Sequence, residues 1–323
     1  MTEGRYTATR RTLARLPSGA DIETTVHRYE GATEGPTLYV QAAQHGREIN
    51  GTEVLRRVHD RLDPDELAGT VVAVPVADPL TFDHVSYTTP EVLDSVNSNM
   101  NRVWPGDADG SLHERLAANL WELAGEADAI VDLHTGFPDY LTHVVFLEGD
   151  SSSRALAEAF GTDLLLSEAA DEAADEEWHR RNFGGKLRVA ATNEGIPSIT
   201  PELAHHREIV EDAVETGVTG TLNVLRHLNM LDGDPVENGE ARLARNHLGR
   251  VTADDSGLFR VDPAYVVGDA VSEGERVGVV YDPTTYEELQ VVETDREGVL
   301  YSIMREATVT AGETLINVAW QRD

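Results

Sequence analysis

The feature that most constrains the fold is the alternation of short apolar segments with segments of helical periodicity. Three apolar segments lie at residues 36–43, 71–76 and 129–133. Residues 49–62 place apolar side chains on one face of a helix, and residues 112–123 form the next predicted helix. A strand that is apolar along its whole length is buried on both faces, so this order predicts an α/β fold in which helices flank the sheet.

The two ends of the chain show a different pattern, in which polar and apolar residues alternate. Residues 1–30 alternate in this way, which predicts an N-terminal β-hairpin at the edge of the sheet. From about residue 238 the alternating runs become short and are separated by glycine, as at 264–268 and 277–281. We therefore expect an α/β domain over residues 1–237 and a small all-β domain over residues 238–323.

The charge composition bears on the partners of the protein. The chain of 323 residues has 58 acidic and 26 basic residues, a formal net charge of −32, and Lys186 is its only lysine. An excess of carboxylates, with arginine in place of lysine, suits a protein that stays dissolved in very high salt, so we expect a halophilic protein. The same charge argues against nucleic acid and anionic membranes as partners.

Cysteine is absent from the chain, which excludes disulfides, thiolate metal sites and a cysteine nucleophile. Any metal ion must therefore be bound by histidine and carboxylate side chains. No segment reaches the roughly 18 consecutive apolar residues that a membrane-spanning helix needs, and the charged start lacks the hydrophobic core of a signal peptide. We expect a cytoplasmic protein without a membrane partner.

Candidate metal ligands follow two of the predicted strands. His45 and Glu48 lie three residues apart directly after the first apolar segment, and His134 follows the third. Because ligands of open α/β sheets gather at the carboxyl ends of the strands, these side chains are expected to meet there. Two histidines and one glutamate, with one position left for water, form the ligand set of a catalytic zinc site. Asp132 is placed to hold the outer nitrogen of the His134 imidazole.

Two further segments carry polar groups suited to substrate chemistry. Asn101 and Arg102 lie in a long polar stretch, residues 77–110, and arginine beside an amide can grip a carboxylate. Glu202 ends a short apolar strand that starts at Ile196, where it could act as general base toward a metal-activated water. Each group alone also has a simpler interpretation, a satisfied polar residue at a strand end or a surface arginine in a turn. Their joint order along an α/β sheet favours a metallohydrolase.

The four motifs, in this order, resemble those of the succinylglutamate desuccinylase and aspartoacylase family, zinc-dependent deacylases related to the metallocarboxypeptidases. The family pattern is His-Gly-x-Glu, then Asn-x-Asn-Arg-x-Phe-Pro-Gly, then Asp-Leu-His, then a glutamate after a Gly-Ile-Pro-like strand. This chain is similar to it from about residue 36 to the C-terminus, with Trp104 in place of the phenylalanine. The resemblance implies a zinc-carboxypeptidase-like mixed sheet flanked by helices, plus a C-terminal β domain similar to a lipoyl or biotinyl carrier.

The resemblance also implies the roles of the site residues. It implies one zinc ion per chain, bound by His45, Glu48 and His134. It implies that Glu202 is the catalytic carboxylate. The side chains that would bind substrate carboxylates are Asn101, Arg102 and, for a more distal carboxylate, Arg188.

Two departures from the family pattern leave roles open. Family members commonly carry an arginine before a proline, where it polarises the scissile carbonyl, but no arginine lies between Arg61 and Arg102 here. The oxyanion would then be stabilised by zinc itself, by Arg47 or by a residue such as His84. The region after residue 238 has no lysine to modify, so it is not a covalent carrier. We expect it to cover the mouth of the active site or to mediate oligomer contacts.

The leading hypothesis from the sequence is a zinc-dependent deacylase or amidohydrolase, a hydrolase of non-peptide C–N amide bonds. Its substrate would be an N-acylated amino acid or a similar small carboxylate-bearing molecule. The alternatives are a metallocarboxypeptidase that acts on short peptides and a non-catalytic zinc-binding or assembly protein of the same fold. The sequence names neither the acyl group nor the amine product, and it leaves a homo-oligomer open.

Overall fold

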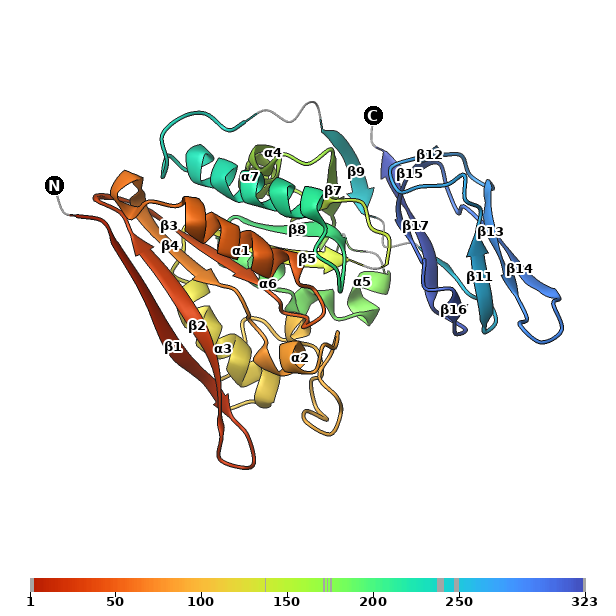
Figure 1. Ribbon diagram of the computed structural model, residues 1–323, viewed down its shortest axis with the longest axis horizontal. Coiled ribbons are helices and arrows are strands. Elements are labelled where there is room, and N and C mark those ends of the chain that lie inside the picture. Colours follow the sequence, from red (N-terminus) through yellow and green to blue (C-terminus); the bar gives the residue numbers. More distant parts are fainter. Residues whose placement is uncertain are drawn as a thin grey trace.

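The structure is a computed structural model that describes residues 3–136, 138–170, 172, 174, 176–236, 241–246 and 250–321. Within these residues the strands form a 13-stranded sheet and a four-stranded sheet (Figure 1). None of the helices described there has the length and apolar character needed to cross a membrane.

In the described part of the chain the helices are α1 (Asn50–Arg61), α2 (Pro79–Asp83), α3 (Leu112–Ala124), α4 (Ser151–Phe160), α5 (Glu176–Arg180), α6 (Leu187–Asn193) and α7 (Glu211–His227). The large sheet contains β1 (Arg5–Arg15), β2 (Asp21–Glu30), β3 (Thr33–Ala42), β4 (Ala68–Val74), β5 (Ala129–Gly136), β6 (His143–Leu147), β7 (Leu164–Glu168), β8 (Ser198–His205), β9 (Arg242–Asn246), β10 (Val251–Thr252), β12 (Ala270–Val271), β15 (Gly298–Ile303) and β17 (Thr314–Gln321). The small sheet contains β11 (Gly257–Val261), β13 (Arg276–Tyr281), β14 (Glu288–Glu293) and β16 (Thr308–Val309).

The large sheet is mixed. Its strands lie in the order β1-β2-β4-β3-β5-β8-β6-β7-β9-β17-β15-β12, with β10 beside β17. The neighbours β4, β3, β5 and β8 are parallel, β6 is antiparallel to β8, and the β1–β2 hairpin joins antiparallel to β4. Parallel strands need crossover connections, and here α1 lies between β3 and β4 and α3 between β4 and β5. The loops that follow β3, β5 and β8 therefore meet at one edge of the sheet.

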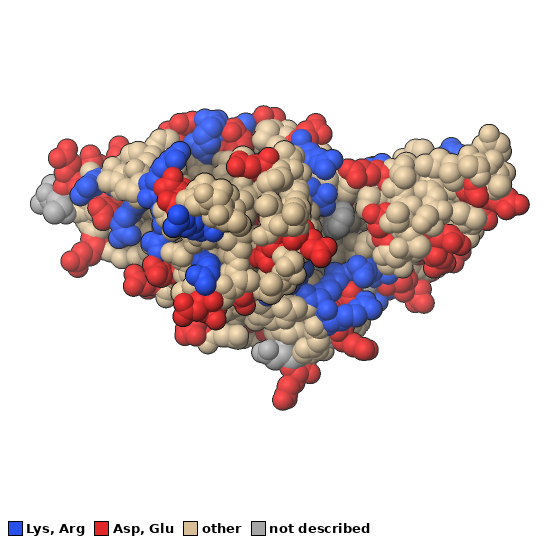
Figure 2. All heavy atoms as spheres, turned by 90° about the horizontal axis from the view of Figure 1, so that it is seen from below, with Lys and Arg blue, Asp and Glu red and all other residues tan. Residues whose placement is uncertain are grey.

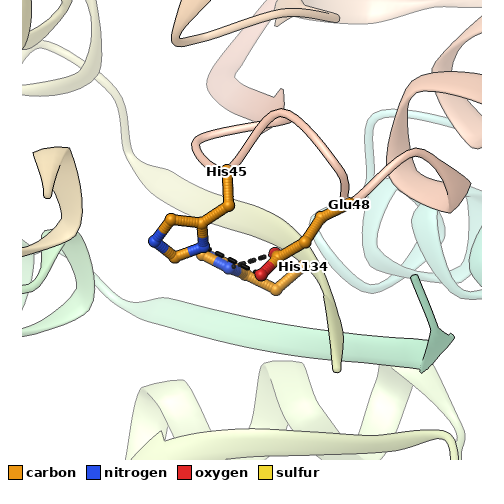
Figure 3. A group of neighbouring side chains, drawn as sticks. All are labelled: His45, Glu48 and His134. Atoms are coloured by element: carbon orange, nitrogen blue, oxygen red, sulfur yellow. Dashed lines mark hydrogen bonds and ion pairs between the residues drawn. The ribbon is translucent and has the colours of Figure 1, made fainter. Parts of the chain in front are cut away.

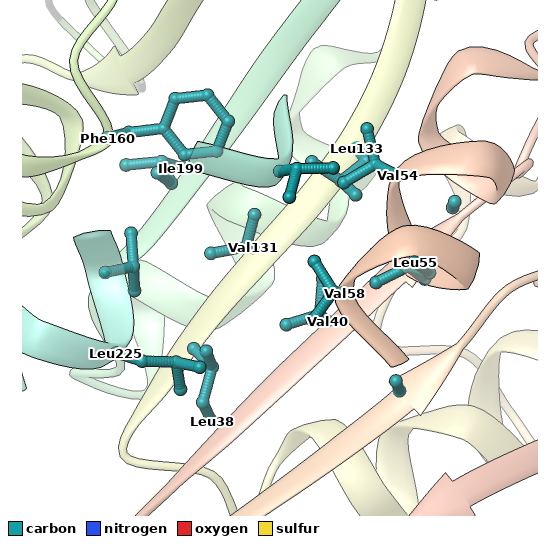
Figure 4. Packing of buried hydrophobic residues seen from close by; sticks show 14 of the residues in the cluster. Leu38, Val40, Val54, Leu55, Val58, Val131, Leu133, Phe160, Ile199 and Leu225 are labelled. Carbon is teal, nitrogen blue, oxygen red and sulfur yellow. The ribbon is translucent and has the colours of Figure 1, made fainter. Parts of the chain in front are cut away.

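Helices cover both faces of the α/β part of this sheet (Figure 1). One core lies between the sheet and the helices α1, α4 and α7, and Figure 4 shows how its side chains interdigitate. Its strand residues include Leu38, Val40, Val131, Leu133 and Ile199. The opposite core joins the other sheet face to α3 and α6. β5 and the second half of β3 are buried on both faces, and apolar residues predominate there, as the sequence predicts.

The strands at the C-terminal end join the large sheet through β9. This strand pairs in parallel with β7 and antiparallel with β17, so pairing continues from the α/β part into the C-terminal strands. The predicted domain boundary between residues 237 and 238 lies outside the described residues. Residues 277–281 belong to β13, whereas residues 264–268 form turns instead of an extended run. The side chains of Asp262 and Asp269 accept hydrogen bonds from backbone N–H groups of that segment, which favours the turns.

A buried imidazole holds the long polar stretch that follows β4. His113 in α3 contacts carboxylates at both ring nitrogens: Nδ1 lies 2.9 Å from Oδ2 of Asp94, and Nε2 lies 3.1 Å from Oδ2 of Asp78. A protonated ring donates to both carboxylates, and Nε2 also lies 2.9 Å from Oγ1 of Thr89. Burial lowers the pKa of His113, but the two aspartates raise it above its usual value of 6.5. This ion triad fastens the segment that bears Asn101 and Arg102 onto α3.

Replacing this imidazole should destabilise the fold and change its pH dependence. The raised pKa means that protonated His113 stabilises the native state fully below about pH 6.5 and that this contribution is lost as pH rises through the native pKa. In His113→Ala the aspartates lose their counter-charge, so we expect the free energy of unfolding at pH 6 to fall by about 3–5 kcal/mol. Urea unfolding at several pH values, with exposed His227→Ala as control, measures this. Equal pH slopes for wild type and His113→Ala would contradict the prediction.

Candidate metal centre and active site

The loop between β3 and α1 carries the first two candidate ligands. His45 and Glu48 lie in this loop, and both are buried. Gly46 allows the loop to pass close to the α2 segment, because a Cβ at this position would lie only 1.9 Å from the carbonyl oxygen of Thr81. The backbone N–H of Glu48 donates to the carbonyl of His45 at 3.0 Å. The turn thus presents both side chains at the carboxyl edge of the sheet.

His134 reaches the same point from β5 (Figure 3). Glu48 bridges the two histidines: its Oε1 lies 2.9 Å from Nδ1 of His45, and its Oε2 lies 2.9 Å from Nδ1 of His134. Oε2 also accepts from the backbone N–H of Thr135 at 3.1 Å, which orients the carboxylate. One ligand atom from each of the three residues lies within 4.8 Å of the others. The structure therefore brings the three predicted metal ligands together.

The outer nitrogen of each imidazole contacts an oxygen. Nε2 of His45 donates to Oδ1 of Asn99 at 3.2 Å, and Nε2 of His134 donates to Oδ2 of Asp132 at 3.0 Å, the contact expected from the sequence. Two buried glutamine amides hold Asp132 in turn, Gln41 at 3.0 Å and Gln44 at 2.7 Å. With hydrogen on each Nε2, the two Nδ1 lone pairs face the centre of the group.

The electrostatics of this group suit a bound cation. Burial raises the pKa of Glu48, but His45 and His134 hold it well below its usual range. Burial lowers the pKa of His134, but Asp132 and Glu48 raise it well above its usual value. The buried carboxylates thus hold a positive charge at this point, as protons or as a metal ion. Two imidazole nitrogens and one carboxylate oxygen are donors that zinc takes in catalytic sites, so the residues fit one metal ion.

Glu202 lies next to the metal group on the neighbouring strand. It is in register with His134 where β8 pairs with β5, and with His143 where β8 pairs with β6. All three side chains line one cavity. Burial raises the pKa of Glu202 to about 7, the charge of Glu48 adds to this rise, and His134 opposes it. A carboxyl group with this pKa can accept and release a proton near neutral pH.

Asn101 and Arg102 lie in a short 3₁₀ turn at Met100–Arg102, and both line the cavity. The Asn101 amide is held within the protein: Oδ1 accepts from the backbone N–H of Leu187 at 3.2 Å, and Nδ2 lies 3.4 Å from Nε2 of His134. The guanidinium carbon of Arg102 lies 4.6 Å from the ring centre of Phe183. The Asn101 amide thus ties the turn to the start of α6, and Phe183 orients the arginine.

Arg188, at the start of α6, also lines the cavity but is paired within the protein. Its Nη2 contacts Oε2 of Glu168, and its Nη1 lies 3.4 Å from Oγ1 of Thr200. Burial lowers the pKa of Arg188 to about 10. Within the described residues its buried Nε has no hydrogen-bond partner, so this guanidinium can still donate to a further oxygen.

These residues surround a cavity of about 340 Å³. Side chains from the C-terminal end complete its wall, namely Tyr301, Thr314 and Asn317. Within the described lining, only Glu48 and Glu202 are acidic, whereas six side chains are basic: Arg47, Arg102, Arg181, Lys186, Arg188 and Arg250. Figure 2 shows a group of basic residues beside the C-terminal strands, among many acidic ones on that face. The cavity therefore reverses the sign of the chain's net charge of −32.

Sequence reasoning missed several lining residues. The Tyr87 ring stacks on His45, with 4.0 Å between ring centroids. His143 lines the cavity at the start of β6. Burial lowers the pKa of His143 to about 4, so its ring is neutral at neutral pH. The apolar run that follows His143 was the pattern that could have placed it at a strand end.

The two side chains considered for the oxyanion lie in different surroundings. Arg47 lines the cavity, with its guanidinium carbon 5.1 Å from the ring centre of Tyr87. His84 is exposed, and its Nδ1 donates to the carbonyl of Leu80 at 2.7 Å. Of these two, Arg47 is the one that faces the cavity.

Comparison with known proteins identifies the family. The profile of the succinylglutamate desuccinylase/aspartoacylase catalytic domain matches residues 34–228. This chain belongs to that family. A curated relative, the N-alpha-acetyl-L-2,4-diaminobutyric acid deacetylase of Halomonas elongata, is 29% identical over an alignment of 301 residues that covers 88% of this chain and 82% of that protein. Family and relative agree with the expected deacylase class.

Solved structures share the fold along the chain. The succinylglutamate desuccinylase from Silicibacter sp. TM1040 has a TM-score of 0.85 at 19% identity, covering 100% of this chain and 96% of its own. The product-bound ectoine utilization protein EutE from Ruegeria pomeroyi has a TM-score of 0.84 at 20% identity, covering 99% and 96%. These similarities confirm the predicted mixed α/β fold.

Each histidine of the metal group should be required for metal binding. We expect elemental analysis of protein purified in high salt to find one zinc per chain, and to find it lost in His45→Ala and in His134→Ala, because each change removes one of three protein ligands. Exposed His227→Ala is the matched control and should retain the metal. Metal that survives both ligand substitutions would place it elsewhere.

Proposed function

We propose that this protein is a zinc-dependent deacylase that hydrolyses the amide bond of a small N-acylated amino acid. The observation that carries the proposal is the placement of Glu202 beside the His45–Glu48–His134 group within one small cavity. Membership of a family of desuccinylases and aspartoacylases supports the reaction class, and the Halomonas relative is a deacetylase by name.

The proton chemistry would fall to Glu202. Zinc, when bound, would polarise the acyl carbonyl and lower the pKa of water to about 7. Glu202, with a pKa of about 7, would accept a proton from the attacking water and pass one to the leaving amine nitrogen. Arg47 faces the cavity and would stabilise the negative charge that develops on the carbonyl oxygen.

The basic lining would bind the substrate carboxylate. Arg102 is held over Phe183 at 4.6 Å, and its planar guanidinium can donate two parallel hydrogen bonds to a carboxylate. Asn101 would position this arginine, since its amide oxygen accepts a hydrogen bond from the Leu187 backbone. The Nε–H of Arg188, which has no partner within the described residues, would donate a hydrogen bond to an additional substrate oxygen.

The cavity size favours small molecules over peptides. A volume of about 340 Å³ is at the low end of the range for small-molecule sites, which is roughly 300–1,000 Å³. Tyr301, Thr314 and Asn317 enclose it from the C-terminal strands, which supports a role for residues 238–323 in narrowing the mouth. The acidic composition, with arginine in place of lysine, supports an enzyme that works in high salt.

Removing the proposed general base should slow turnover without releasing the metal. We expect Glu202→Gln to lower kcat for acylated amino acids by about 10²–10⁴ with unchanged zinc content, because glutamine keeps the shape but cannot accept the proton. In wild type, kcat/KM should rise with pH through a midpoint at or below about 7, since a nearby divalent cation would lower the pKa of Glu202.

The assay should include N-acylated amino acids and short peptides side by side. Near-full turnover by Glu202→Gln would overturn its assignment. Preference for peptides would favour the carboxypeptidase alternative, and zinc-loaded protein that hydrolyses no compound would favour a binding protein.

Arg102 should act on substrate binding. We expect Arg102→Met to lower kcat/KM about 10- to 100-fold, because a charged hydrogen-bonded contact contributes about 1.5–3 kcal/mol. Arg102→Lys should recover only part of this, since a lysine cannot make the two-pronged contact. Exposed Arg56→Met, which also removes one positive charge, should leave kcat/KM unchanged. Steady-state kinetics at fixed high salt measures the effect, and equal losses in Arg56→Met and Arg102→Met would refute a specific contact.

A further inference from the structure

Lys186 is an exception to the composition of the whole chain. The other 25 basic residues are arginines. The single lysine is not at the surface, where charge alone would matter, but is 8% exposed and lines the cavity. It lies between the 3₁₀ turn at Phe183–Gly185 and α6. A chain that otherwise uses arginine for every positive charge has a compact ammonium group or amine at this one position, which points to a local requirement.

The contacts of Lys186 define that requirement. Its Nζ lies 3.3 Å from Oε1 of Glu168 and 3.3 Å from the ring centre of Phe183. The other oxygen of Glu168 contacts Nη2 of Arg188. Glu168 ends β7 and is 0% exposed. Lys186 and Arg188, which both line the cavity, therefore contact the two oxygens of a buried carboxylate that lies behind the lining.

The pairing of Glu168 with Lys186 and Arg188 determines which carboxylates remain available to a substrate. Within the described lining, Glu48 and Glu202 are the acidic residues, and the proposed function uses both in the chemistry. Glu168 is a further carboxylate, and it contacts two of the lining side chains. A substrate with a positively charged side chain needs a carboxylate partner, because burying an unpaired ammonium group is strongly unfavourable.

We propose that Lys186 is a specificity-determining residue that covers Glu168 and so excludes substrates whose amino-acid side chain carries an ammonium group. This inference rests on the proposed function, since it names the substrates that the same site rejects. Neutral and acidic substrate side chains need no free carboxylate. An acidic side chain can also accept hydrogen bonds from the arginines of the lining. Burial lowers the pKa of Lys186, but an amine and an ammonium group both donate N–H to Glu168, so the cover persists in either state.

Two substrates of nearly equal shape isolate this effect. N-acetyl-L-2,4-diaminobutyrate ends its side chain in an ammonium group, and N-acetyl-L-norvaline ends it in a methyl group. We expect wild type to prefer the norvaline compound, and we expect Lys186→Met to shift the ratio of kcat/KM values at least tenfold toward the diaminobutyrate compound. Exposed Arg154→Met controls for loss of one charge.

A double substitution tests whether the shift depends on Glu168. In Lys186→Met with Glu168→Gln, no carboxylate remains to accept the substrate ammonium group, so the gained activity on the diaminobutyrate compound should disappear. Calorimetric binding of the products L-2,4-diaminobutyrate and L-norvaline gives a second measurement that does not need turnover. It should show the same shift in the ratio of Kd values. Thermal melting and zinc content verify each variant, and Lys186→Ser replaces Lys186→Met if the latter does not fold.

The outcomes separate this inference from the proposed function. A wild type that prefers the ammonium substrate would overturn the role of Lys186. A ratio that changes less than twofold in Lys186→Met would also overturn it. If wild type hydrolyses no acylated amino acid, the proposed function fails, and the product-binding ratios still decide whether Lys186 excludes an ammonium group.

Discussion

The rest of the site depends on one buried carboxylate that is shared by two imidazoles. Glu48 contacts Nδ1 of both His45 and His134 at 2.9 Å. Charges buried in this way need close opposite partners, because their desolvation is otherwise not offset. The turn at Gly46 and the end of β5 must therefore keep their relative positions. The outer contacts, from Asn99 and Asp132, extend this fixed geometry to the polar loop and to the centre of the sheet.

High salt changes the distance over which the acidic surface and the basic cavity can act on a charged molecule. At about 1 M salt, charges interact through solvent over only about 3 Å, so neither the acidic surface nor the basic cavity acts at a distance. Contacts inside the cavity are less affected, since buried pairs are screened much less than exposed ones. Under the proposed function, selection among substrates in high salt would depend on direct contacts made by residues such as Arg102, held over Phe183, and Lys186, paired with Glu168.

The sequence predicted the parts of the fold that have a local pattern. Apolar segments marked β3, β4 and β5, because most of their residues are buried, and the histidines that follow β3 and lie near the end of β5 indicated where ligands meet. Contacts between distant segments have no such pattern. The pairing of Lys186 with Glu168 joins the ends of two elements 18 residues apart, and Asn317 reaches the cavity only because β17 pairs with β9. The turns at 264–268 escaped prediction because flanking aspartates, not apolar spacing, determine them.

The register of β8 determines where a residue can be inserted into or deleted from this chain without moving Glu202 out of the cavity. Glu202 faces the cavity because it pairs in register with His134 on one side and His143 on the other. Successive side chains of a strand face opposite sides, so inserting or deleting one residue between Ser198 and Glu202 would turn the carboxylate to the other face of the sheet. The same change at Gly195, in the turn before the strand, leaves the pairing intact. An insertion in that turn should therefore keep Glu202 in the site, whereas a change of one residue within β8 before Glu202 should remove it.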